Sequence, residues 1–250
     1  MPGNRWIIGV AVAALAGLAA FLLLRDGGAD GEDVDLPAGL EREDLELVIR
    51  DYILENPEII PEAMERLQRR GQAERVSAVR TELETPFAGA WAGNEDGAVT
   101  VVEFFDYACG YCRESLEDVR RLIAEQEDVK VVFRELPVLG AESREAARVS
   151  LAAARQGEFF DFHRAMYAAG RPGEASIAAA GRRAGLDAAR VRRDIADPAF
   201  DAELAGNLQL AQQLQLSGTP VFIVGDQILE GAVGYDRLLE AVEEARRQGG

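Results

Sequence analysis

The sequence predicts an α/β domain with an inserted helical domain, preceded by a short α-helical segment and an N-terminal transmembrane helix. Three patterns support this: a strand–helix–strand order over 99–133, a helical stretch at about 141–216, and an uncharged apolar run over 6–24. The 250 residues divide accordingly into a signal-anchor or transmembrane helix at 1–25, an acidic linker at 26–40, a helical segment at 41–85 and the α/β domain at 86–250.

The composition restricts the classes of function. Hydrophobic residues make up 48% of the chain and charged residues 28%, which is enough apolar material for a core, so a wholly disordered chain is excluded. The formal net charge of −17 would repel a phosphate backbone, so we expect no nucleic acid as a partner. Two cysteines and one histidine are too few for a zinc site within one chain, and we expect neither a metal site nor a cofactor.

The apolar run near the N-terminus fits a membrane-spanning helix. Residues 6–24 carry no charge and would form a helix about 28 Å long, close to the hydrocarbon thickness of a bilayer. Arg5 and the terminal amine weakly favour a cytoplasmic N-terminus, so we expect a single-pass inner-membrane protein with its C-terminal domain in the periplasm or extracytoplasmic space. The alternative is a signal peptide cleaved near Ala14-Leu15-Ala16, which would leave a periplasmic protein.

Two short amphipathic helices are expected after the Gly- and Asp-rich linker. The first ends at Asn56-Pro57, and Pro61 suits the first turn of the second. Each apolar stripe is too short to form a core alone. Packing within the monomer and self-association both remain open, and we favour self-association because a charged stretch at 68–80 separates these helices from the α/β domain. Residues 41–85 are therefore a candidate homo-oligomerisation segment.

The α/β domain begins with a strand–helix–strand unit. Residues 99–105 are β-branched and aromatic, as in a central strand buried on both faces, and a second strand follows at 129–133. The stretch at about 141–216 is rich in Ala, Arg and Glu at helical spacing, and residues 221–229 read as a β-hairpin before a final helix. This order predicts a helical block inserted between the two halves of one sheet.

Two cysteines stand where the first strand gives way to a helix. Cys109 and Cys112, separated by Gly110 and Tyr111, can close a disulfide, because their Cα atoms would lie near the preferred distance of about 5.5 Å. So short a loop gains little stability from the bond, which favours an exchange role over a structural one. The helix N-terminus favours a thiolate at Cys109, and Cys112, one turn inside, would resolve the mixed disulfide. A c-type haem site would need a histidine where the chain has Arg113.

Three residues elsewhere bear on this pair. Glu103 stands six residues before the first cysteine on the buried strand, where a raised pKa would let it exchange protons with Cys112; an exposed strand glutamate is the alternative. A cis Thr219–Pro220 bond beside the cysteines would explain a proline at a strand entry, and a trans proline is the alternative. His163, among aromatic residues, is expected to be a packing or surface histidine and not a catalytic one.

Together these features resemble the DsbA-type branch of the thioredoxin superfamily. The resemblance rests on FFDYACGYC after a strand, the inserted helices and GTPVFIVG before a final helix, over roughly 99–247; IRDYILENPEII is similar to the N-terminal segment of exported ScsC-like members. It implies a thioredoxin fold and a thiol:disulfide oxidoreductase. The roles it implies are nucleophile for Cys109, resolving thiol for Cys112, buried acid for Glu103, cis-proline for Pro220 and substrate binding for Thr219, Gly110 and Tyr111.

With the apolar run at 6–24, the resemblance leads us to expect a membrane-tethered enzyme that acts on exported cysteine-containing proteins and is reset by a membrane redox partner of DsbB or DsbD type. The dipeptide Gly110-Tyr111 differs from the Pro-His of strongly oxidising members and is similar to that of disulfide isomerases, so the oxidase, isomerase or reductase direction stays open. Two other classes remain. One is a Cu(I)-binding periplasmic protein that uses the reduced cysteine pair, and the other is a chaperone-like protein whose helical segment binds unfolded exported chains.

Overall fold

The computed structural model describes residues 42–249, which divide into two units at Glu62 and Ala63. The predicted transmembrane helix at 1–25 and acidic linker at 26–40 lie outside the described residues. Over 42–249, every helix is too short or too polar to cross a bilayer.

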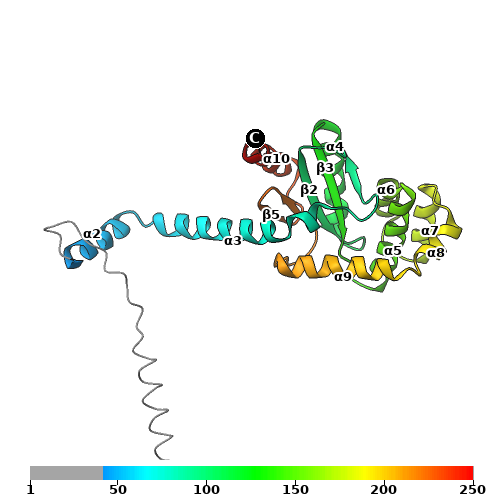
Figure 1. Ribbon diagram of the computed structural model, residues 1–250, viewed down its shortest axis with the longest axis horizontal. Coiled ribbons are helices and arrows are strands. Elements are labelled where there is room, and N and C mark those ends of the chain that lie inside the picture. Colours follow the sequence, from blue (N-terminus) through cyan, green and yellow to red (C-terminus); the bar gives the residue numbers. More distant parts are fainter. Residues whose placement is uncertain (1–41, 250) are drawn as a thin grey trace, which may run out of the picture. The chain divides into compact units, whose positions relative to one another are not determined.

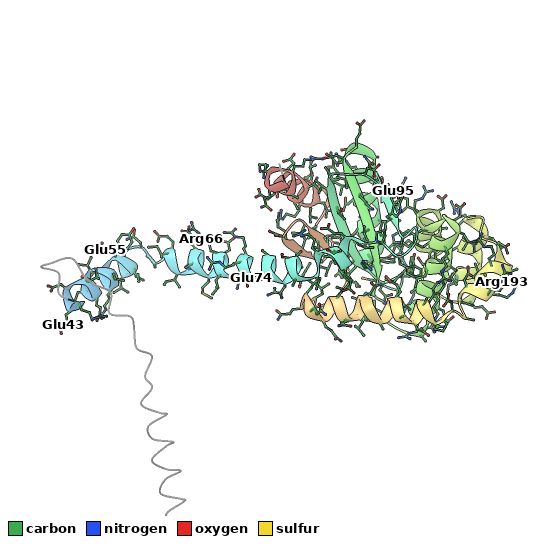
Figure 2. The ribbon with its side chains drawn as sticks, viewed as in Figure 1. Glu43, Glu55, Arg66, Glu74, Glu95 and Arg193 are labelled. Atoms are coloured by element: carbon green, nitrogen blue, oxygen red, sulfur yellow. The ribbon has the colours of Figure 1, made fainter. Side chains whose placement is uncertain are left out.

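The first unit holds α2 (Arg42–Glu55) and the start of α3 (Ile59–Glu84) (Figure 1). Asn56 ends α2, since both its backbone N–H and its side-chain amide donate to the Tyr52 carbonyl at 2.9 Å. Charged side chains such as Glu43 and Glu55 extend from this helix (Figure 2), and none of its residues is buried. Large apolar side chains of α2 and early α3 are exposed: Leu47, Val48, Ile49, Tyr52, Leu54, Ile60, Met64 and Leu67.

The second unit is built on a five-stranded sheet in the order β1-β3-β2-β4-β5. Its strands are β1 (Trp91–Gly93), β2 (Val99–Phe105), β3 (Val129–Glu135), β4 (Val221–Val224) and β5 (Gln227–Glu230). The central strand β2 runs parallel to β3, to which α4 (Gly110–Glu125) connects it, and antiparallel to β4. The predicted strand–helix–strand unit and the later hairpin are therefore confirmed.

Alternating side chains of the sheet enter two cores on its opposite faces. Val101 and Phe105 pack in a cluster with α4 and the C-terminal helix α10 (Tyr235–Gly249). Val102 and Phe104 pack in the other cluster, with the second half of α3 and with α9 (Pro198–Gln213). Because helices cover both faces of the sheet, apolar side chains occupy nearly every position of β2.

The predicted helical insertion is confirmed between β3 and β4. It comprises α5 (Ala141–Gln156), α6 (Phe159–Ala169), α7 (Glu174–Arg183), α8 (Ala188–Asp194) and α9. Gly157 ends α5 in the left-handed conformation (φ 80°), which glycine adopts without strain. The side chains of Asp187 and Asp197 accept backbone N–H groups at the starts of α8 and α9, so local capping defines where these helices begin.

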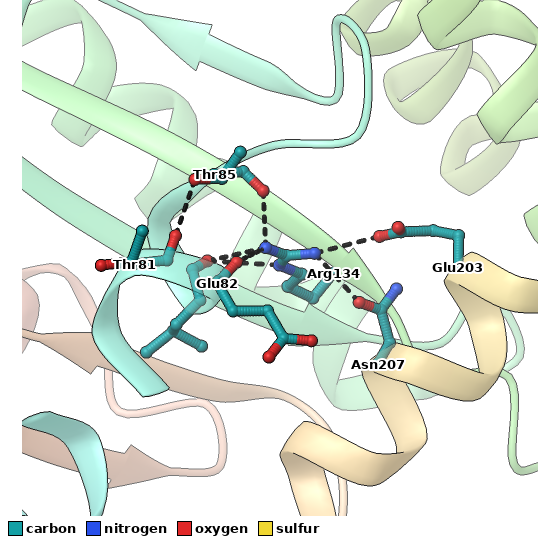
Figure 3. A network of polar contacts seen from close by, with 7 residues as sticks. Thr81, Glu82, Thr85, Arg134, Glu203 and Asn207 are labelled. Atoms are coloured by element: carbon teal, nitrogen blue, oxygen red, sulfur yellow. Dashed lines mark hydrogen bonds and ion pairs between the residues drawn. The ribbon is translucent and has the colours of Figure 1, made fainter. Parts of the chain in front are cut away.

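The boundary predicted near residue 85 coincides with the end of α3, yet the second half of this helix belongs to the sheet's core. Val76 and Leu83 are fully buried in the cluster on the α9 face. Buried Arg134 of β3 fixes the end of the helix, because its guanidinium donates to the carbonyl oxygens of Leu83 (3.1 Å) and Thr85 (2.6 Å) (Figure 3). These carbonyls have no partner within the helix, so Arg134 acts as its C-terminal cap.

Candidate active site

The two cysteines lie where β2 leads into α4. Cys109 is the N-cap residue of α4, and Cys112 follows within its first turn. Cys109 is 7% exposed and Cys112 is fully buried, so an approaching disulfide meets Cys109 first. Between them, Tyr111 is 66% exposed, and a Cβ atom at Gly110 would meet no neighbour within 4 Å. The dipeptide therefore forms open surface beside the sulfur of Cys109.

A loop more than a hundred residues further along the chain lies next to Cys109. The Thr219–Pro220 peptide bond is cis, and the thiol of Cys109 donates a hydrogen bond from Sγ to the Thr219 carbonyl oxygen at 3.2 Å. Pro220 is buried and leads into β4, which pairs with β2. Pairing of β2 with β4 thus brings Thr219 and Pro220 to the cysteines.

Glu103 is buried in β2, with 1% of its surface exposed, so the alternative of an exposed glutamate is wrong. The pKa of Glu103 is raised to about 8, mainly by burial and to a lesser extent by the charge of Cys109. Its Oε2 atom has no hydrogen-bond partner among the described residues. Burial also raises the pKa of the Cys112 thiol, and the charge of Glu103 raises it further. A carboxyl group that titrates near neutrality can accept the proton that this thiol must lose to react.

A second buried carboxyl, Glu135, was missed by the sequence analysis. It lies at the end of β3, opposite Phe105 of β2. Burial raises its pKa well above the usual value, although the Ser150 hydroxyl partly favours the charged form. Its Oε1 atom has no partner within the described chain. The sequence does contain a signal for it, because side chains alternate between the two faces of a strand. Glu135 follows Phe133 by two positions and so lies on the same core face, but the strand was predicted to end at Phe133.

A polar network runs through the aromatic core next to the site. The Tyr107 hydroxyl shares hydrogen bonds with Ser150 Oγ (2.8 Å) and His163 Nδ1 (3.2 Å). Burial lowers the pKa of His163 to about 3, so its ring is neutral at physiological pH. Its centroid lies 4.7 Å from that of Phe105 and 4.9 Å from that of Tyr167. His163 is thus a buried packing residue.

Asp106 fixes the loop that carries the cysteines. Its carboxylate accepts hydrogen bonds from the backbone N–H of Ala108 (2.7 Å) and Leu139 (2.9 Å) and from the Ser143 hydroxyl (2.6 Å). These contacts join the loop before α4 to the loop after β3, where the side chains of Val138 and Leu139 are exposed. The sequence analysis missed Asp106, although an aspartate that accepts the N–H two residues ahead is a recognisable turn signal.

Comparison with known proteins identifies the domains. Residues 100–243 match the DSBA-like thioredoxin domain family, and residues 41–74 match the family described as the copper resistance protein ScsC N-terminal domain. A thioredoxin-like oxidoreductase from Silicibacter pomeroyi DSS-3 is 40% identical, with a TM-score of 0.62 over 66% of this chain and 95% of that chain. The thiol-disulfide exchange protein alpha-DsbA2 from Wolbachia pipientis is 28% identical, with a TM-score of 0.66 over 71% and 97%.

Further relatives agree on the redox domain. The catalytic domain of Proteus mirabilis ScsC is 26% identical, with a TM-score of 0.63 over 69% of this chain and 97% of that chain. A periplasmic thioredoxin-like protein from Salmonella enterica serovar Typhimurium is 29% identical, with a TM-score of 0.62 over 67% and 95%.

Two curated relatives differ in length. Disulfide bond formation protein D of Bacillus subtilis (strain 168) is 25% identical, over 61% of this chain and 74% of its own length. Na(+)/H(+) antiporter NhaA 3 of Salinispora tropica is 32% identical over 61% of this chain, and the chain spans only 24% of that relative's length. Because the DSBA-like match covers more than half of the chain, the chain belongs to the DSBA-like thioredoxin domain family.

Proposed function

We propose that the protein exchanges disulfides with exported cysteine-containing proteins through Cys109 and Cys112. The observation that best supports this proposal is the position of Cys109 at the start of α4, with its Sγ 3.2 Å from the Thr219 carbonyl oxygen. Buried Glu103, next to the pair, supplies the proton acceptor that the reaction needs. The exposed dipeptide Gly110-Tyr111 and the half-buried Thr219 offer backbone and side-chain surface to a substrate.

The proposed reaction has two displacement steps. The Cys109 thiolate attacks one sulfur of a substrate disulfide, so a Cys109–substrate bond forms, the substrate bond breaks and the released sulfur takes up a proton. Cys112 then passes its proton to Glu103 and attacks Cys109, which closes the protein disulfide and releases the second substrate thiol. The cysteine pair thereby gives two electrons to the substrate disulfide. The same steps in reverse oxidise a substrate dithiol.

The setting of the reaction is part of the proposal. The apolar run at 6–24 and the similarity to a periplasmic thioredoxin-like protein support a chain anchored in the inner membrane, with the redox domain in the periplasm or extracytoplasmic space. A membrane redox partner of DsbB or DsbD type would return the pair to its starting state. The reduction potential of the pair, measured against that partner, sets the net direction.

We also propose that residues 41–85 bring copies of the chain together. Eight large apolar side chains of α2 and early α3 are exposed, and α2 buries none of its residues. Large apolar side chains that are exposed in such number are usually covered by a partner. In the full chain, V48D combined with Y52D should lower the molar mass measured by light scattering, whereas the surface control E46Q should leave it unchanged. An unchanged mass for the double variant would contradict self-association through this segment.

Thiol trapping tests the main proposal. C109S should abolish insulin reduction and the refolding of a scrambled disulfide substrate. C112S should keep the first attack but accumulate a covalent Cys109–substrate disulfide, because no thiol remains to resolve it. Full activity of C109S, or failure of C112S to trap any substrate, would overturn the proposal.

Cu(I) binding by the reduced pair is a second candidate, supported by the match of residues 41–74 to a copper resistance protein domain. Thiolates are soft ligands that suit Cu(I). Over 42–249, no group of three or more His, Cys, Asp and Glu side chains could hold a metal, so such a site would depend on the two sulfur atoms. Anaerobic titration would support it by tight one-to-one Cu(I) binding that is lost in C109S, and the absence of such binding would exclude it.

A further inference from the structure

A groove lined by arginines lies beside the active-site helix. This arginine groove has a volume of about 420 Å³ and lies between α4, α6 and α7. Its arginines are Arg113 and Arg120 of α4, Arg164 of α6 and Arg183 of α7, and none of its lining residues is acidic. In a chain with 44 acidic and 27 basic residues, such a local excess of positive charge runs against the overall composition.

The α4 wall of the groove begins one helical turn after Cys109. Arg113, Leu116 and Arg120 follow Cys109 by four, seven and eleven positions, which places them along one face of α4 below its N-cap. The Arg113 backbone N–H donates to the Cys109 carbonyl at 3.3 Å. With about 1.5 Å of rise per residue, Arg120 lies about 16 Å along the helix axis from Cys109.

The other wall of the groove is also tied to the active site. Tyr167 of α6 lines the groove, and its hydroxyl donates to the Asp106 carbonyl oxygen at 3.3 Å, in the loop that leads to the cysteines. Leu116, between the two α4 arginines, is half-buried and offers an apolar contact. Tyr167 therefore connects this wall of the groove to the loop before the cysteines.

The positive charges of the groove are available to a ligand. Within the described part of the chain, Arg113 and Arg183 form no ion pair. Arg120 pairs with Glu117 at 2.6 Å and Arg164 pairs with Asp161, but both pairs are solvent-exposed neighbours on their own helices. Exposed pairs of this kind contribute little to stability, so a ligand can replace them.

We infer that the arginine groove binds an acidic stretch of the substrate polypeptide that flanks the reacting cysteine. An extended peptide advances about 3.3 Å per residue, so about five residues span the distance from Cys109 to Arg120. Guanidinium groups bind carboxylates with paired, directional hydrogen bonds, which suits aspartate and glutamate side chains. This inference rests on the proposed disulfide exchange and adds the class of substrate that the enzyme prefers.

Two matched peptides test the inference with the full-length protein. Each carries one cysteine as a thiopyridyl disulfide, flanked on both sides by five aspartates in one peptide and five asparagines in the other. The rate constant for attack by the reduced protein is measured at low and high salt. We expect the wild type to react about tenfold faster with the acidic peptide at low salt, and salt to reduce this preference. The net charge of −17 alone predicts the opposite order.

Substitutions then locate the preference. R113Q combined with R120Q should bring the ratio of the two rates close to one, and R183Q alone should lower the ratio. R190Q, an exposed arginine on α8, removes the same charge outside the groove and should keep the preference. A wild type without preference for the acidic peptide, or an equal ratio in R113Q/R120Q and R190Q, would overturn the inference. If the wild type reacted with neither peptide, the proposed function would be overturned instead.

Discussion

Glu103 and Cys112 share one buried site, where burial raises the pKa of the thiol and a negative charge on the carboxyl raises it further. Burial likewise raises the pKa of Glu103, to about 8. The two groups therefore resist being ionised together, and the site tends to keep one proton. This coupling sets the conditions under which Cys112 can attack the mixed disulfide on Cys109.

The first prediction concerns that attack. In the wild type, resolution of a Cys109 mixed disulfide should accelerate as the pH rises through about 8, because the Glu103 carboxylate then forms and can accept the Cys112 proton. In E103Q this inflection should disappear, and the rate above pH 8 should fall by about 10²-fold. Stopped-flow release of thiopyridone after reaction with dithiodipyridine measures the step. E95Q, at an exposed loop position, is the control and should behave as wild type. A wild-type pH profile in E103Q would remove Glu103 from the mechanism.

The second prediction concerns stability at alkaline pH. The pKa of Glu103 is raised from 4.5 to about 8 in the folded protein, so the folded state holds a proton that the unfolded state releases. The stabilisation is complete below pH 4.5 and is lost as the pH rises through 8, by up to roughly 5 kcal/mol. E103Q carries no such group, so its free energy of unfolding should fall less between pH 5 and pH 9. Urea titrations at several pH values measure the difference, and parallel curves for the two proteins would contradict it.

The third prediction concerns stability at acid pH. Burial lowers the pKa of His163 from 6.5 to about 3, so the unfolded state takes up a proton that the folded state excludes. This contribution is complete above pH 6.5 and is lost as the pH falls toward 3, by up to roughly 5 kcal/mol. H163F keeps an aromatic ring but cannot be protonated, so it should lose less stability between pH 7 and pH 4 than the wild type.

At neutral pH, H163F should be less stable by about 1 kcal/mol, because the Tyr107 hydroxyl loses one of its two partners. H163Q provides a second comparison, since its amide can hydrogen-bond Tyr107 but does not titrate. If H163F and H163Q lost as much stability in acid as the wild type, the acid sensitivity would have to come from other groups.

The redox pair and its strand could be predicted because their signals are local. A β-branched run, two cysteines three positions apart and an amphipathic helix occupy one stretch of sequence, and the structure places them in β2 and α4 as predicted. The helical insertion was similarly predictable from its periodicity. The second buried acid, Glu135, was missed because β3 continues two residues beyond its last predicted position.

The stretch 85–97 contains a short strand that the sequence did not predict. Trp91–Gly93 forms β1 and pairs with β3. A Cβ atom at Gly97 would lie 2.8 Å from the Asp128 carbonyl oxygen and from the Lys130 backbone nitrogen. Gly97 is therefore required by a close approach of two backbone segments, a long-range contact that the sequence does not mark.

The last prediction concerns Arg134, whose partners also come from distant parts of the chain. Its guanidinium donates to carbonyls at the end of α3 and to Glu203 (3.0 Å) and Asn207 (3.2 Å) of α9. R134M should lower the free energy of unfolding by about 3–5 kcal/mol, because it leaves buried carbonyls and the largely buried Glu203 carboxylate without their donor. Amide hydrogen exchange over 76–84 should become faster, since this end of α3 loses its cap.

The matched control is R69M, also on α3, where Arg69 forms an exposed ion pair with Glu65 at 2.9 Å. Exposed pairs contribute at most about 1 kcal/mol, so R69M should change stability little and leave exchange over 76–84 unchanged. E203Q should be intermediate, because the neutral amide oxygen still accepts a hydrogen bond from Arg134. Equal stability of R134M and R69M would show that packing of Val76 and Leu83 alone holds the second half of α3 on the sheet.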